Sequence, residues 1–144
     1  MAIGEFSFLL SNERAIGMKI AGLFEEFWPP AANPRGSIRE FVAESGSADE
    51  ARICRYLRSG DFVFAAMGMA EDVFGSGESI MGGSSVLTDG EWVWRSDLQF
   101  YVSKYHVELP HEFVDRIRSL QYSVPVVSVE DMSMLTDQIV EIRS

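Results

Sequence analysis

The segment VLTDGEWVW, at residues 86–94, constrains the fold more than any other part of the chain. The dipeptide Asp89-Gly90 favours a two-residue hairpin loop, because both loop positions require positive φ. Apolar side chains flank it with period two, which is the spacing along one face of a strand. The segment therefore predicts a β-hairpin at residues 84–95, in which a two-residue loop sets Leu87 opposite Trp92. One face of this hairpin would carry Leu87, Trp92 and Trp94, and the other Val86 and Val93.

Helical periodicity surrounds the hairpin. Ser47 with Glu50, and Ser96 with Gln99, match the capping-box pattern that begins many helices. Apolar residues that recur every three or four positions predict helices at residues 12–28, 37–44, 47–60, 96–106, 110–120 and 128–142. Apolar runs predict strands at residues 3–10, 61–67 and 122–127, the second largely buried and the third at an edge because it contains Pro125. These elements predict a single α+β domain over residues 1–144, with a small mixed sheet packed by several short helices.

The composition fits one globular domain. The 144 residues are 47% hydrophobic, and the surplus of Asp and Glu gives a net charge of −10. This charge argues against direct nucleic-acid binding, because phosphate contacts require a basic surface. A single cysteine excludes an internal disulfide, and no uncharged apolar stretch reaches the roughly 18 residues that a membrane span requires. The N-terminus lacks the basic start of a secretory signal, so we expect a cytoplasmic protein that does not enter a membrane.

The residue pattern predicts no cofactor or metal site. His106 and His111 flank Pro110, and we expect them to be exposed turn histidines rather than metal ligands. The glycine-rich residues 75–85 contain no Lys or Arg to meet a phosphate, so we expect them to form turns and to allow close strand packing. Cys54 lies on the apolar face of its helix, which predicts a buried, inert thiol. We therefore expect no cofactor, no metal and no catalytic residue, that is, a protein that is not an enzyme.

Charge is distributed unevenly along the chain. No Lys or Arg occurs between Arg58 and Arg95, whereas this segment contains six carboxylates and two tryptophans. Carboxylates steer the approach of a basic partner, and exposed aromatic residues anchor it. The predicted contact residues are Glu71, Asp72, Glu78, Asp89, Glu91 and one of Trp92 and Trp94. An ordinary acidic surface, with both tryptophans in the core, fits the same residues.

The segment SVLTDGEWVWRSDLQFYVSKYHVELPHEF, at residues 85–113, resembles a family of small, largely uncharacterised bacterial proteins. The shared core is approximately LTDGxWxWxxDLxxYVxxY, and the preceding YLRSG at residues 56–60 is similar as well. Members of this family resemble immunity proteins of bacterial toxin systems. The resemblance implies a basic protein partner, a cognate toxin domain whose active site the chain would occlude. That active site would be the substrate cleft of a nuclease, or the nucleotide cleft of an NAD-consuming or ADP-ribosylating toxin.

Two other functions fit the same sequence. The chain could be a small-molecule-binding or regulatory domain, with a pocket between the hairpin and the helix that starts at Ser96. It could also be an enzyme that uses carboxylate chemistry, for which the adjacent Glu71 and Asp72 are the best candidates. Such an enzyme requires a pocket that raises the pKa of one carboxyl group.

Overall fold

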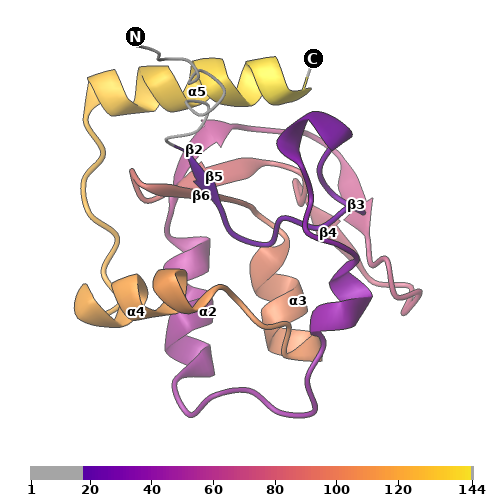
Figure 1. Ribbon diagram of the computed structural model, residues 1–144. Coiled ribbons are helices and arrows are strands. Elements are labelled where there is room, and N and C mark those ends of the chain that lie inside the picture. The colour runs from indigo at the N-terminus through magenta and orange to yellow at the C-terminus, as the bar shows by residue number, and fades with distance from the viewer. Residues whose placement is uncertain (1–17, 144) are drawn as a thin grey trace, which may run out of the picture.

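In a computed structural model of the protein, which describes residues 18–143, a four-stranded sheet separates two layers of helix (Figure 1). The strand order is β1-β6-β5-β2. The strands are β1 (Lys19–Ile20), β2 (Asp61–Phe64), β5 (Val86–Thr88) and β6 (Trp92–Arg95). β1 is parallel to β6 and the other pairs are antiparallel, so the sheet is mixed. The α+β class predicted from the sequence is confirmed.

Three helices cover one face of this sheet, and one long helix covers the other (Figure 1). The first group is α2 (Glu50–Arg58), α3 (Leu98–Tyr105) and α4 (His111–Ser119), and the single helix is α5 (Val129–Arg143). Two 3-10 helices, η1 (Pro30–Ala32) and η2 (Ile38–Phe41), lie in the N-terminal part of the described chain. Across residues 18–143, no helix is long and apolar enough to cross a membrane.

A second, two-stranded sheet forms a hairpin beside the first. It pairs β3 (Met69–Glu71) with β4 (Ser79–Met81), and Ala70 lies opposite Ile80. The inner face of this hairpin packs on Gly83, where an added Cβ would come within 2.8 Å of the Ala70 Cβ. The glycine-rich segment therefore serves turns and close strand packing, as the sequence predicts.

The central hairpin divides the core in the way the sequence predicts. Leu87, Trp92 and Trp94 belong to the larger core cluster with α2, α3 and α4, whereas Val86 and Val93 pack with α5. The predicted register is wrong: Thr88 pairs with Val93 and Leu87 with Trp94, so that four residues lie between the last paired residues instead of two. The shift is two positions, and because side chains alternate with period two, every residue keeps its face.

Hydrogen bonds from side chains of the hairpin loop to its own backbone determine the length of the loop. Asp89 Oδ1 accepts hydrogen bonds from the backbone N–H groups of Glu91 and Trp92, at 2.9 and 2.8 Å. Thr88 Oγ1 accepts from Gly90 N and donates to Trp92 O, at 2.9 and 2.7 Å. These bonds satisfy the loop backbone in a wider turn than the Asp-Gly dipeptide predicts.

The helix predicted at residues 12–28 is wrong in its described part. Lys19 and Ile20 form β1, and turns follow up to Trp28. Gly22, at φ +71°, directs the chain away from β1, and a Cβ there would lie 2.9 Å from a Leu98 methyl group. The predicted strand at residues 3–10 lies outside the described residues.

Several local predictions also need correction. The strand at residues 61–67 ends at Phe64 and is not buried: Phe62 is 60% exposed, because β2 is an edge strand. Residues 122–127 form no strand but an irregular connection between α4 and α5. The two capping boxes do not form, since Asp49 and Asp97, and not Ser47 and Ser96, occupy the N-cap positions of α2 and α3. The last helix is capped by Ser128, whose Oγ accepts a hydrogen bond from Asp131 N at 3.0 Å.

Candidate functional site

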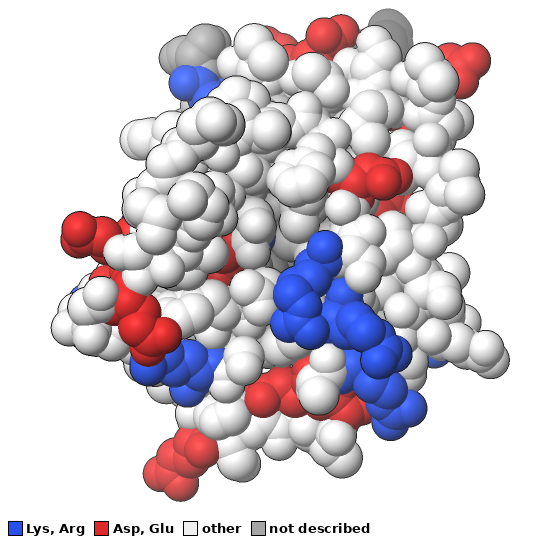
Figure 2. Space-filling view, turned by 180° about the vertical axis from the view of Figure 1, so that it is seen from behind, with Lys and Arg blue, Asp and Glu red and all other residues white. Residues whose placement is uncertain are grey.

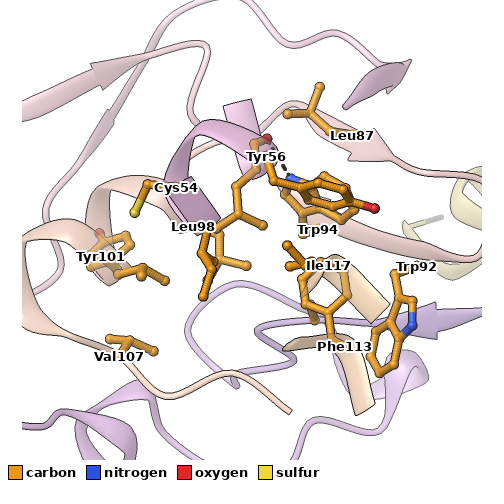
Figure 3. Close-up of a cluster of buried hydrophobic side chains, with 14 of the residues drawn as sticks. Cys54, Tyr56, Leu87, Trp92, Trp94, Leu98, Tyr101, Val107, Phe113 and Ile117 are labelled. Carbon is orange, nitrogen blue, oxygen red and sulfur yellow. Dashed lines mark hydrogen bonds between the residues drawn. The ribbon is translucent and has the colours of Figure 1, made fainter. Parts of the chain in front are cut away.

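Both tryptophans of the predicted contact surface lie in the core. Trp94 is fully buried and donates its Nε1–H to Leu57 O at 2.9 Å. Trp92 is 6% exposed, and both indole rings pack against the ring of Phe113 (Figure 3). The expectation that one of them is exposed is therefore wrong, and neither is available as a surface anchor for a partner.

Asp89 is also buried and has a structural role. It is 1% exposed, and its Oδ2 accepts a hydrogen bond from the Tyr56 hydroxyl at 2.5 Å and from Arg116 Nε at 3.0 Å. Burial and then the hydrogen bond to Asp89 raise the pKa of Tyr56 far above its usual value. This carboxylate joins the hairpin loop to α2 and α4 and is not available to a partner.

Asp72, in the turn between β3 and β4, is likewise buried and hydrogen-bonded within the protein. It is 5% exposed and accepts hydrogen bonds from Phe74 N at 2.9 Å and from the Tyr105 hydroxyl. Burial raises the pKa of Asp72, but the hydrogen bonds from Ser76, Tyr105 and Phe74 outweigh it, so the net shift is downward. A carboxyl group with a lowered pKa is a poor general acid at neutral pH, so Asp72 does not fit the carboxylate enzyme considered above.

The remaining three predicted contact residues are exposed but do not form one continuous surface. Glu91 accepts from Arg116 and Lys19 at the hairpin loop, at 3.1 and 3.3 Å. Glu78 pairs with Lys104 of α3. Glu71 lies on β3 and has no ion-pair partner among residues 18–143. The acidic segment therefore forms two separate groups, one beside α4 and one beside α3.

The same acidic segment carries an exposed apolar surface that the sequence pattern did not predict. Met69 and Met81 lie directly opposite each other on β3 and β4, and are 57% and 73% exposed. Met67, just before β3, is 96% exposed. We call Met67, Met69 and Met81 the methionine surface. Glu71, two residues after Met69 on the same strand, shares its face. The period-two spacing of Met69 and Glu71 on β3 was the sequence signal that could have revealed this surface.

Cationic side chains gather on a different part of the molecule. Arg52, Arg55 and Arg58 are exposed on α2, and none of them forms an ion pair within the described part of the chain. Figure 2 shows a continuous run of Lys and Arg on the side where α2 lies, and a broad area above it with little charge. Acidic side chains border this run in Figure 2, so the two signs of charge are not separated on this side of the molecule.

Two hollows open beside α4. The larger has a volume of about 580 Å³ and is named here the Trp92 groove. Its walls are apolar and are formed by Leu23, Phe24, Phe41, Trp92, Leu109 and Pro110. Charged side chains also line it: Lys19, Arg35, Glu108 and Glu112, together with His111. The groove lies between β1, the hairpin loop and the start of α4, and not against α3 as the sequence suggested.

The smaller hollow, about 360 Å³, contains His106. His106 Nδ1 lies 2.9 Å from Glu50 Oε2, and the histidine is half-buried, not exposed as predicted. His111 lines the same hollow and is exposed as predicted. Within residues 18–143, no group of three or more His, Cys, Asp or Glu side chains is arranged to hold a metal ion.

Cys54 lies in the core, as the sequence predicts. Its side chain is 4% exposed and its Sγ lies 3.7 Å from Gln99 O. Burial, and then the nearby Glu50 carboxylate, raise the pKa of the thiol to about 11. The thiol is therefore protonated at neutral pH and is not a nucleophile.

Comparison with known proteins does not assign the chain to a family. No family model, curated protein or solved structure matches it.

Proposed function

We propose that the chain is a non-enzymatic binding protein of the immunity type, which occludes the active site of a cognate toxin domain with a basic surface. The observation that carries this proposal is the methionine surface, which lies in a segment with exposed carboxylates and no Lys or Arg. The contact residues differ from those predicted from the sequence, because methionine side chains replace the tryptophans as apolar anchors.

The apolar part of this surface suits a protein partner. Contiguous exposed apolar side chains are characteristic of interaction sites. Methionine is flexible and polarisable, so it adapts to the shape of a partner. Phe62 on the neighbouring edge strand β2 is 60% exposed and adds an aromatic side chain in the same segment of the chain. An edge strand also offers unpaired backbone groups to a partner.

The charged part suits a basic partner. Asp61 and Glu71 are exposed and form no ion pair with any described residue, so their negative charge is uncompensated. Carboxylates placed beside apolar contacts accelerate the encounter with a basic surface and suppress binding to acidic ones. The partner surface that fits best is therefore apolar at its centre and basic at its rim, like the mouth of a cleft that binds an anionic substrate.

The test is to purify the chain together with the products of its neighbouring genes and to measure binding by calorimetry. Met69→Asp with Met81→Asp should weaken the complex about a hundredfold, because it places two charges in the apolar contact. Glu71→Lys should mainly slow association and reduce its salt dependence. Met134→Asp is the matched control, since Met134 is 60% exposed on α5, outside the methionine surface.

Two results would contradict the proposal. One is that no neighbouring gene product with a toxin domain binds the chain. The other is that Met69→Asp with Met81→Asp binds its partner as tightly as Met134→Asp does, which would locate the interface elsewhere.

A further inference from the structure

The Trp92 groove has the features of a small-ligand site, independently of the methionine surface. Its volume of about 580 Å³ falls within the range of natural ligand sites, roughly 300–1,000 Å³. Its apolar lining includes Leu23, Phe24, Phe41, Leu109 and Pro110. Sites of this kind bind the apolar body of a ligand, while a few polar groups fix its orientation.

Trp92 lines the groove and has an unused hydrogen-bond donor. The residue is 6% exposed, its Nε1–H has no hydrogen-bond partner among residues 18–143, and this atom remains accessible to solvent. Figure 3 shows the indole nitrogen on the side of the ring that faces away from Phe113. In contrast, the Nε1–H of the neighbouring Trp94 is used internally, by Leu57 O. Because this donor is open to solvent, water can accept its hydrogen bond in the free protein, and a polar atom of a ligand could replace that water.

The charged groups of the groove differ in whether they are already paired. Lys19 is paired with Glu91 and Glu112, at 3.3 and 3.9 Å, and its Nζ lies 5.6 Å from the Trp92 ring centroid. Arg35 and Glu108 also line the groove. Neither of these two side chains forms an ion pair or hydrogen bond with a described residue, including with each other.

The backbone fixes the positions of Arg35 and Glu108. Arg35 N donates to Leu23 O at 2.9 Å, and Glu108 N donates to Phe41 O at 2.8 Å. One cation and one anion therefore extend from fixed backbone positions at the apolar lining; both side chains are exposed, and their charges are uncompensated. A ligand that carries both charges would pair with both groups, whereas a purely anionic ligand would be repelled by Glu108 and a purely cationic one by Arg35.

We infer that the Trp92 groove binds a free α-amino acid with a large apolar or aromatic side chain. The ligand carboxylate pairs with the Arg35 guanidinium, which suits a planar carboxylate geometrically. The ammonium group pairs with Glu108. The side chain lies between the walls and extends toward Trp92, whose Nε1–H can donate to a bound water or to a polar atom of the ligand.

The experiment is an NMR titration that observes the three indole N–H signals, one for each tryptophan of the chain. Trp92→Phe identifies the Trp92 signal. L-phenylalanine should shift that signal with saturation and leave the Trp94 signal unchanged. 3-Phenylpropionate lacks the ammonium group and phenethylamine lacks the carboxylate, so each should bind at least about tenfold more weakly than L-phenylalanine. Glycine, which lacks the side chain, should not saturate.

Variants test the two charges separately. Arg35→Gln should weaken binding of L-phenylalanine about tenfold without weakening that of phenethylamine, and Glu108→Gln should do so without weakening that of 3-phenylpropionate. Arg39→Gln and Glu44→Gln are controls of the same type, because both side chains are exposed outside the groove. Thermal unfolding confirms that each variant is folded.

The inference is overturned if L-phenylalanine does not shift the Trp92 signal at concentrations up to about 10 mM. It is also overturned if 3-phenylpropionate binds as tightly as L-phenylalanine, or if Arg35→Gln and Glu108→Gln behave like their controls. None of these outcomes depends on the presence of a protein partner at the methionine surface.

Discussion

Arg116 of α4 donates through Nε to Asp89 Oδ2 over 3.0 Å, and this buried ion pair fastens the central hairpin loop to the helical layer. The same guanidinium donates through Nη1 to the exposed Glu91 carboxylate at 3.1 Å and through Nη2 to the Asp89 carbonyl oxygen at 3.4 Å. The Tyr56 hydroxyl of α2 donates to the same carboxylate oxygen. One carboxylate therefore connects three elements that are distant in sequence.

Replacing Asp89 with Asn should strongly destabilise the protein. The amide cannot pair with the charge of Arg116 or accept every bond that the carboxylate accepts, so we expect a loss of about 2–5 kcal/mol. Urea unfolding gives the free energy directly. Glu91→Gln is the control, because Glu91 is an exposed partner of the same arginine and should cost no more than about 1 kcal/mol. Similar losses in both variants would show that burial of Asp89 is not the cause.

Protonation of Asp49 should weaken the fold in acid. Hydrogen bonds from Arg118 and Tyr122 hold the pKa of this carboxyl group far below its usual value, against the opposing effect of burial. The unfolded chain binds this proton near pH 3.9, whereas the folded protein binds it only at lower pH. The contribution is therefore complete above about pH 4 and is lost as the pH falls through the folded pKa.

Asp49→Asn tests this pH dependence. Unfolding of both proteins at several pH values between about 3 and 6 should show that wild type loses more free energy than the variant as the pH falls. The difference between the two curves isolates Asp49 from Asp72 and Glu26, whose pKa values are also lowered. Parallel curves would mean that Asp49 has the same pKa in the folded and unfolded states.

The hydroxyl of Thr88 should be required for the wide hairpin loop. Its Oγ1 bonds both Gly90 N and Trp92 O, and the residue is fully buried. Thr88→Val keeps the shape but leaves both backbone groups without this partner, which should cost about 1–3 kcal/mol. Thr88→Ser keeps the hydroxyl and should recover much of the stability. Equal stability of the Val and Ser variants in chemical denaturation would argue against this role.

The thiol of Cys54 should be unreactive in the folded protein. Its pKa, raised to about 11 by burial, leaves almost no thiolate at pH 7.5, and the core blocks access. Iodoacetamide should not label the native protein, as read by intact mass, and should label it fully in urea. Rapid native labelling would indicate that the α2–α3 contact opens readily, because Cys54 lies between these helices.

The faces of the central hairpin could be predicted from the sequence, but its register could not. Alternation of apolar residues assigns Leu87 and Val86 to opposite faces whatever the loop length. The loop itself depends on which side chains bond the backbone, and Asp89 and Thr88 do this in a way that the Asp-Gly dipeptide does not indicate. The prediction of a helix before Pro29 was wrong for a similar reason. The helical spacing of Ile20 and Phe24 does not reflect one buried helix face, because Ile20 lies in a strand and Phe24 packs into the core from a turn.

The predicted contact surface was only partly identifiable, for a related reason. The sequence locates the segment without Lys or Arg, but does not distinguish an exposed carboxylate such as Glu71 from a buried one such as Asp89. Burial of Asp89 depends on Arg116, which is distant in sequence. The sequence could not predict the Trp92 groove either, because Arg35, Glu108 and Trp92 come to line the same groove only through long-range packing.

β1 has a consequence for the order in which the fold assembles. Only Lys19 and Ile20 pair with β6, and their partners Trp92 and Val93 lie far along the chain. The hairpin of β5 and β6 can form from neighbouring residues, whereas β1 must close a long loop for few hydrogen bonds. We therefore expect β1 to dock late in folding and to detach first under mild denaturant. Because Lys19 and Ile20 also form part of the groove wall, the protein would acquire this hollow only in the last step of its folding.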